Sequence, residues 1–124
     1  MTARLAATIG ALLGAAGIIL GAFGAHALRA HLEPRDLETF ETAVRYQMYH
    51  AFGLFGAAWL MSRNTPYAAP AAWAFIVGIA LFSGSLYLLA ATGQRWLGAV
   101  TPVGGLAFIS GWVLLALAAN RLEG

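Results

Sequence analysis

Apolar residues run through most of this chain, and charged residues interrupt them at only a few points. Long stretches without a formal charge separate the arginines, at residues 5–28, 46–62, 64–94 and 96–120. A bilayer core about 30 Å thick is crossed by roughly 20 apolar residues of α-helix. The first, third and fourth stretches exceed this length, and the second reaches it when one flanking turn of helix is included. The pattern predicts an all-α membrane protein, a four-transmembrane-helix up-down bundle with spans at about 5–28, 46–62, 71–91 and 96–119.

The connection between the first two spans has a different pattern, which predicts a short amphipathic helix at the membrane surface over about 34–45. Pro34 suits the first turn of a helix, and Asp36 lies near the positive end of the helix dipole. Leu37, Phe40 and Val44 recur at helical spacing. Because the other connections are short, we expect one membrane domain over 1–124 with both termini on one side.

Glycines mark one face of the first span. They recur at spacings of 4, 3, 4 and 3 residues, at Gly10, Gly14, Gly17, Gly21 and Gly24. In lipid, small residues mark the surfaces where helices approach each other closely. We therefore expect these five glycines, together with Gly53 in the second span, to form helix-packing contacts.

Arg4 and the apolar run up to Ala25-His26-Ala27 also resemble a signal peptide, but the run exceeds the roughly 7–15 residues of a signal core, so we expect a retained span.

Composition narrows the possible functions. The chain is 60% hydrophobic and 10% charged, has a net charge of +2, and contains no cysteine. Scattered arginines form no basic patch, which disfavours nucleic-acid binding. The absence of cysteine excludes disulfides and thiolate metal sites. No familiar hydrolase, metalloprotease, phosphate-binding or dinucleotide-binding motif is present, so we expect a protein that is not an enzyme and holds no cofactor and no metal.

Orientation follows from the arginines beside the spans. Three of them fall on the side of the termini and four on the other side, so the counts nearly balance. Arg4 precedes a strongly apolar first span. On that basis we expect the termini to lie in the cytoplasm of a bacterial cell whose inner membrane the chain crosses several times.

Polar residues gather toward one membrane face, where the up-down topology brings four span ends together. They are His26, Tyr46, Gln47, Tyr49, His50, Ser83, Ser85, Tyr87 and Thr101. Polar groups at membrane depth are costly unless they pair with one another or line a cavity. We therefore predict a polar half-cavity at this face that binds a ligand through these nine residues.

On the second span, Tyr46, Tyr49, His50 and Gly53 recur at i, i+3, i+4 and i+7, so they share one stripe that should face inward. An imidazole in this position suits a proton relay or a ligand clamp. The alternative is that His50 bonds a neighbouring group and locks two helices together. His26 either interacts with the end of its own helix or, in a sharper alternative, joins His50 at the same depth to hold a haem or metal.

Four short motifs resemble the bacterial family known as domain of unknown function 423, whose eukaryotic relatives are called transmembrane protein 256. The motifs are Gly21-Ala22-Phe23-Gly24-Ala25-His26-Ala27-Leu28, Tyr46-Gln47-Met48-Tyr49-His50, Ser83-Gly84-Ser85-Leu86-Tyr87 and Thr101-Pro102-Val103-Gly104-Gly105. They occur in order over nearly the whole chain. The resemblance implies a small inner-membrane protein of about four helices, and it carries over no catalytic role.

Three functional hypotheses remain. The first is a non-enzymatic membrane protein that binds a small ligand, a lipid or a partner helix in the polar half-cavity. The second is a membrane redox or proton-relay subunit that uses His26 and His50. The third is a structural assembly factor, and the expected partners are the lipid bilayer and a homo-oligomer or other membrane protein.

Overall fold

The computed structural model describes residues 1–124 and contains helices but no strands. The elements in chain order are α1 (Ala3–Ile18), η1 (Ile19–Gly24), α2 (Ala25–Leu28), α3 (Pro34–Ser62), α4 (Ala68–Gly78), η2 (Ile79–Ser83), α5 (Gly84–Thr92), η3 (Arg95–Ala99) and α6 (Thr101–Ala119). Both η1 and η2 are π-helical turns inside otherwise α-helical rods, whereas η3 is a 3₁₀ turn. The chain therefore forms four helical rods.

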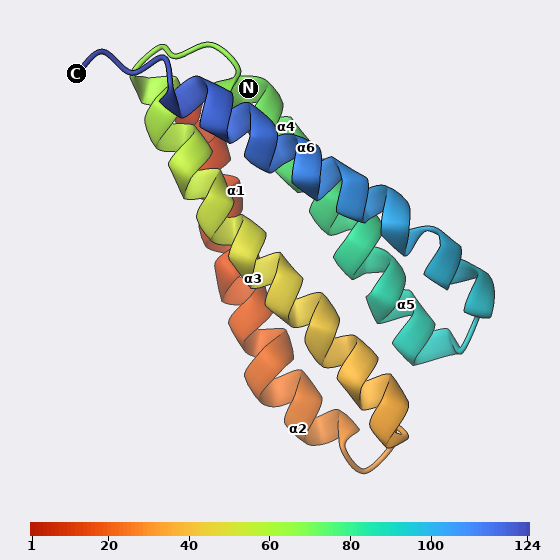
Figure 1. Cartoon of the computed structure of the whole chain (residues 1–124). Helices are drawn as coiled ribbons and strands as arrows, with labels where there is room; N and C mark the ends of the chain where they lie inside the picture. Colours follow the sequence, from red (N-terminus) through yellow and green to blue (C-terminus); the bar gives the residue numbers. More distant parts are fainter.

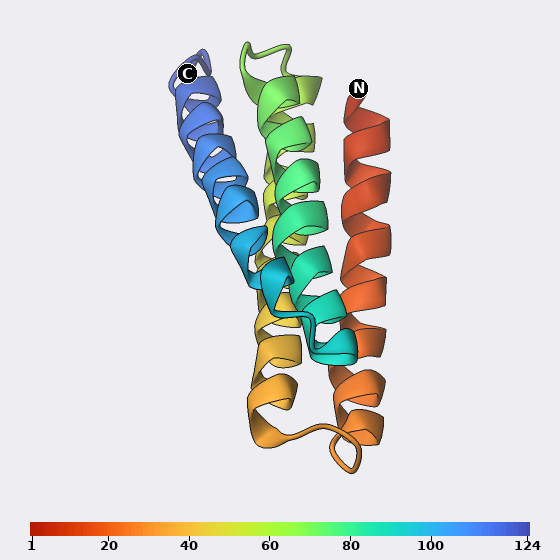
Figure 2. The same ribbon diagram turned by 90° about the vertical axis from the view of Figure 1, so that its right-hand side faces the viewer.

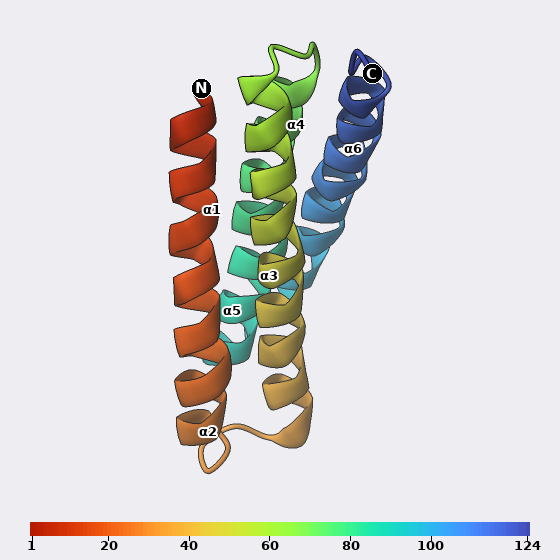
Figure 3. The same ribbon diagram turned by 90° about the vertical axis from the view of Figure 1, so that its left-hand side faces the viewer.

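The rods form two antiparallel hairpins (Figure 1). The first pairs α1, η1 and α2 with α3, and the second pairs α4, η2 and α5 with η3 and α6. The two hairpins meet near the termini and diverge toward the opposite end in this view, and the turned views show both termini at the same end (Figures 2 and 3). Helix α3 contacts α1, α4, α5 and α6 and is the central helix of the molecule.

Three of the rods are long and apolar enough to cross a membrane, namely Ala3–Leu28, Ala68–Thr92 and Arg95–Ala119. They correspond to the first, third and fourth of the expected spans. Helix α3 is also long, with 29 residues, but it is less apolar because its first third is charged and its middle contains Gln47 and His50.

Residues 34–45 are helical and run without a break into the second span, as the first part of α3 (Pro34–Ser62). The physical reason lies in packing. The ring of Phe40 lies against Gly24, and Val44 lies against Gly21. The apolar side of this segment is therefore covered by the first rod, which holds the segment along the axis of the bundle.

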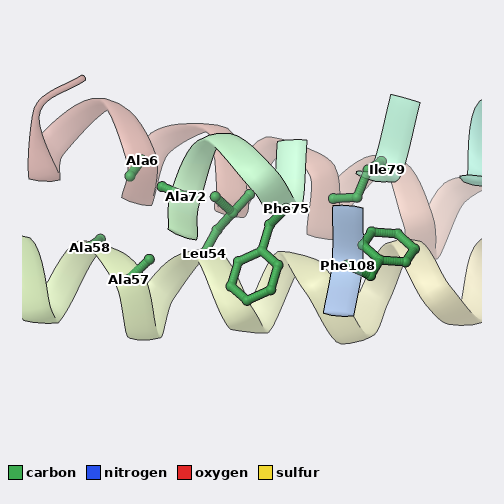
Figure 4. Close-up of a cluster of buried hydrophobic side chains, with 8 residues drawn as sticks. All are labelled: Ala6, Leu54, Ala57, Ala58, Ala72, Phe75, Ile79 and Phe108. Atoms are coloured by element: carbon green, nitrogen blue, oxygen red, sulfur yellow. The ribbon is translucent and has the colours of Figure 1, made fainter. Parts of the chain in front are cut away.

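The core lies where the two hairpins meet. Its largest cluster combines residues of all four rods around Phe75 and Leu54, both fully buried. Figure 4 draws its members Ala6, Leu54, Ala57, Ala58, Ala72, Phe75, Ile79 and Phe108. Alanine and glycine dominate the contacts around these few large side chains, as expected for helices that pack closely in lipid.

Most of the glycines in the first rod lie against α3. An added Cβ would be 3.1 Å from the Ala51 carbonyl oxygen at Gly10, and equally tight contacts would arise at Gly17, Gly21 and Gly24. Gly14 differs, because an added Cβ there would meet no heavy atom within 4 Å. In the second rod, Gly53 accommodates the ring of Phe75, which would lie 3.0 Å from an added Cβ.

Candidate functional site: an aromatic groove between α3 and α6

Two helices face each other with matching stripes. On α3 the stripe holds Tyr46, Tyr49 and His50, and on α6 it holds four residues at the same i, i+3, i+4 and i+7 spacing, namely Gly105, Phe108, Ile109 and Trp112. Together with Phe82 of η2 they line a groove of about 460 Å³. Because Gly105 has no side chain and the hairpins diverge here, the groove stays open at the surface of the bundle.

His50 forms the floor of this groove and is only 4% exposed. Its Nε2 accepts a hydrogen bond from the indole Nε1 of Trp112 at 3.0 Å, and its Nδ1 lies 2.6 Å from the carbonyl oxygen of Tyr46. An indole N–H is a donor only, so Nε2 must be the unprotonated nitrogen. Nδ1 therefore carries the proton and donates it to the Tyr46 carbonyl. Both ring nitrogens of a neutral His50 are occupied within the protein.

This arrangement predicts one tautomer of His50. In ¹⁵N-detected NMR of the protein in micelles, we expect a protonated Nδ1, an unprotonated Nε2, and a Trp112 indole proton shifted downfield by its hydrogen bond. The exposed His26 provides the internal comparison, because its ring has no hydrogen bond in the structure. A protonated Nε2 on His50 at neutral pH would contradict the assignment.

Aromatic rings make up most of the groove wall, and three of them are nearly parallel. The rings of His50 and Phe108 are stacked with centroids 3.5 Å apart and 7° between planes. The ring of Tyr46 lies 6.3 Å from each of them, at 16° to His50 and 22° to Phe108. His50 and Phe108 are buried against each other, whereas the rings of Tyr46, Tyr49 and Trp112 are exposed in the groove wall. Exposed aromatic rings favour flat partners, because offset stacking uses the whole face of each ring.

The other buried polar residues are bonded across the bundle and do not face an open cavity. The Gln47 amide donates to the Leu13 carbonyl of α1 at 2.8 Å and accepts from the Tyr87 hydroxyl of α5 at 2.6 Å. Ser83 donates to the Ala43 carbonyl at 2.7 Å. Gln47 and Ser83 therefore connect α1 and the second hairpin to the central helix.

A further hydrogen bond joins α5 to α6, since the hydroxyls of Ser85 and Thr101 lie 2.6 Å apart. No buried side-chain nitrogen or oxygen is left without a partner. Five of the nine predicted residues are therefore bonded within the bundle, namely Gln47, Ser83, Ser85, Tyr87 and Thr101. Three others, Tyr46, Tyr49 and His50, line the groove that the fold creates.

The structure also separates His26 from His50. Gly24, two residues from His26, lies against Phe40 of α3, and His50 lies ten residues further along α3, about 15 Å away by the helical rise. The expectation that both imidazoles lie at one depth is therefore wrong. No group of three histidine, aspartate or glutamate side chains comes together anywhere in the chain. With both nitrogens of His50 already bonded, the geometry disfavours a shared haem or metal site.

The sequence reasoning missed the residues that complete the groove, namely Phe82, Gly105, Phe108, Ile109 and Trp112. The repeat from Gly105 to Trp112 was a usable signal, because it copies the spacing from Tyr46 to Gly53. Phe82 had no such signal. It reaches the groove because the π turn η2 adds one residue to the helix there, which places Phe82 toward α6 while Ser83 bonds to α3.

Residues 20–105 match the family described as Protein of unknown function (DUF423). The chain belongs to the DUF423 family. The matched segment contains all four motifs on which the resemblance rested, as well as all the polar residues discussed above. It also contains the α3 side of the groove and the first groove residue of α6, Gly105.

Full-length relatives agree with this assignment. The chain is 43% identical to the UPF0382 membrane protein YwdK of Bacillus subtilis over 91% of this chain and 94% of the relative. It is 37% identical to the UPF0382 inner membrane protein YgdD of Escherichia coli over 99% of this chain and 95% of that relative. No solved structure matches the chain. With its three long apolar helices, this DUF423 protein is a multi-pass protein of the bacterial inner membrane.

Proposed function

We propose that the chain crosses the membrane four times and that the groove between α3 and α6 binds a small, planar, lipid-soluble molecule. The four-span arrangement rests on the position of α3. It runs antiparallel to α1 at the centre of the bundle, and it is uncharged from residue 46 to residue 62. Its polar residues bond to neighbouring helices, so α3 tolerates a lower hydropathy than helices that face lipid. Residues 34–45 then extend into the headgroup region.

We also propose that both termini face the cytoplasm. Arg4, Arg63 and Arg121 lie at the end of the bundle that holds the termini. Arg4 precedes the strongly apolar first span, and the first span usually dominates the orientation of a multi-pass protein. A C-terminal fusion to an enzyme that works only in the periplasm should therefore stay inactive, and an active fusion would reverse the orientation.

The observation that carries the ligand proposal is the set of exposed aromatic rings, Tyr46, Tyr49 and Trp112, around an open groove. Volumes of about 300–1,000 Å³ are typical of small-molecule sites, and the groove of about 460 Å³ falls in that range. The hydroxyls of Tyr46 and Tyr49 make no hydrogen bond within the chain, so they remain available for one polar group of a ligand. Flat faces on the wall favour a ring system over a flexible acyl chain, and lipid-soluble molecules reach the groove from the bilayer.

Fluorescence of Trp112 tests this proposal. Trp59, Trp73 and Trp96 are exposed and can be replaced by phenylalanine, which leaves Trp112 in the groove wall as the only indole. We expect 1,4-naphthoquinone, a planar quencher, to reduce the fluorescence of this protein in micelles along a saturable curve. Gly105→Leu should abolish the saturable part, because a leucine side chain fills the groove without a clash.

Gly14→Leu is the matched control, since it places the same side chain on an open helical surface away from the groove. It should leave the quenching curve unchanged. A linear curve, or one that Gly105→Leu does not alter, would contradict ligand binding in the groove. If phosphatidylcholine brominated on its acyl chains quenches Trp112 and naphthoquinone does not displace it, the occupant is an acyl chain and the planar-ligand proposal is wrong.

A further inference from the structure

A second cavity lies away from the aromatic groove, at the end of the bundle that holds the termini. It has a volume of about 530 Å³ and is formed by the α3–α4 loop and the chain after α6. Its lining is almost entirely polar, with Leu122 as the one hydrophobic residue, and consists of Arg63, Asn64, Thr65, Pro66, Arg121, Leu122 and Glu123. Because these residues cap the ends of two long rods, the cavity lies at the depth of lipid headgroups.

Two arginines in this cavity have no acidic partner. The one ion pair in the structure joins Arg35 to Asp36, so neither Arg63 nor Arg121 has a carboxylate within 4.0 Å. Glu123 also lines the cavity but contacts neither guanidinium at that distance. This end of the bundle carries three arginines against a single acidic side chain, so the whole net charge of +2 is located here.

The loop holds the arginines in a defined arrangement. Asn64 and Tyr67 both adopt left-handed backbone conformations, with φ of 57° and 71°. Such a conformation is unusual for a bulky aromatic residue and persists only where surrounding contacts maintain it. Here the guanidinium of Arg121 lies 5.8 Å from the centre of the Tyr67 ring, within the range of a cation–π contact. Thr65 fastens the loop to α3 by donating to the Leu60 carbonyl at 2.8 Å.

We infer that this cavity binds a phosphate group. Guanidinium groups are planar and present paired N–H donors that match phosphate oxygens, and the Asn64 amide adds another donor. Two sources supply this chemistry at a membrane surface, namely the headgroup of an anionic phospholipid and free inorganic phosphate. The Glu123 carboxylate lines the same cavity and opposes the binding of an anion there.

Calorimetric titration of the purified full chain in neutral, phosphate-free detergent tests this inference. Short-chain phosphatidylglycerol should bind saturably, whereas a diacylglycerol with the same chains and no phosphate should not. Arg63→Gln and Arg121→Gln should each weaken phosphatidylglycerol binding by about tenfold, because each removes a charge-assisted contact. Glu123→Gln should strengthen binding. Competition distinguishes the sources: displacement of the lipid by millimolar phosphate indicates free phosphate, and lack of displacement indicates the lipid headgroup.

Arg95→Gln is the matched control, because it removes the same charge from an exposed arginine at the other end of the bundle. It should leave the affinity for phosphatidylglycerol unchanged. Equal weakening by Arg95→Gln would show a diffuse charge effect and overturn the inference. Unchanged binding in the Arg63→Gln, Arg121→Gln double variant, or weaker binding after Glu123→Gln, would overturn it as well.

Discussion

Replacing Gly104 with alanine should destabilise the bundle by about 3 kcal/mol, because α6 and the π turn η2 meet here backbone to backbone. An alanine Cβ at this position would lie 2.8 Å from the Cα of Phe82 and closer still to its backbone nitrogen. Backbone atoms within a packed helix have no alternative rotamer. The new methyl group must therefore push α6 away from the second rod and weaken the contacts along both helices.

The adjacent Gly105 provides the control for this effect. The nearest heavy atom to an added Cβ at Gly105 is Cδ2 of Phe82 at 4.0 Å, an ordinary contact. Gly105→Ala should therefore be neutral or stabilise the helix by about 0.5–1 kcal/mol, since alanine restricts the unfolded chain more than glycine. Unfolding in mixed micelles, followed by circular dichroism, compares the two variants. Similar midpoints for Gly104→Ala and Gly105→Ala would contradict the close approach at Gly104.

The second large effect concerns the pair of His50 and Trp112. Replacement of His50 by alanine should lower the free energy of unfolding by about 3 kcal/mol, since it leaves a space beneath Phe108 and deprives the Trp112 indole N–H of its acceptor. His26→Ala, at an exposed position with no side-chain hydrogen bond, should change stability by less than about 0.5 kcal/mol. The same unfolding measurement separates these two histidines, and equal effects would contradict the central role of His50.

Ring-for-ring substitutions test the hydrogen bond itself. His50→Phe keeps the stacked ring but leaves the indole N–H unpaired, and Trp112→Phe leaves Nε2 of His50 unpaired. Each substitution should lower the free energy of unfolding by about 1–2 kcal/mol. The double variant should lose less than the sum of the two, because neither polar group of the pair is left without a partner. Measured hydrogen-bond couplings inside membrane proteins average about 0.6 kcal/mol and reach about 1.7 kcal/mol. Strict additivity of the two substitutions would show that the hydrogen bond does not contribute.

The helical rods themselves were largely predictable. Apolar runs between arginines located the three rods that are long and apolar enough to cross a membrane. The amphipathic helix predicted over 34–45 forms the first part of α3. Its amphipathic pattern does describe a helix with one covered face, but the pattern does not reveal whether lipid or α1 covers that face.

Of the nine polar residues singled out from the sequence, His26, Tyr46 and Tyr49 are exposed, whereas Gln47, His50, Ser83 and Ser85 are buried. Their positions at membrane depth required partners, which the sequence does not name. Gln47 contacts residues 34 and 40 positions away, and His50 bonds to a residue 62 positions away. Such contacts depend on how each helix is rotated about its axis, and a few tens of degrees decide whether a polar group meets a partner or an open cavity.

The amino-acid sequence by itself determined that this protein is helical, that it belongs in a membrane, and which stripes of its helices carry glycines and polar groups, because charge spacing and helical periodicity are local properties. The tertiary structure alone decided which of these polar groups are bonded inside the bundle, that α3 is the central helix, and that the opening of the bundle is an aromatic groove. Those outcomes depend on the pairing of two stripes from α3 and α6, and on a π turn that shifts the register of Phe82. Neither is encoded in the pattern of any single helix.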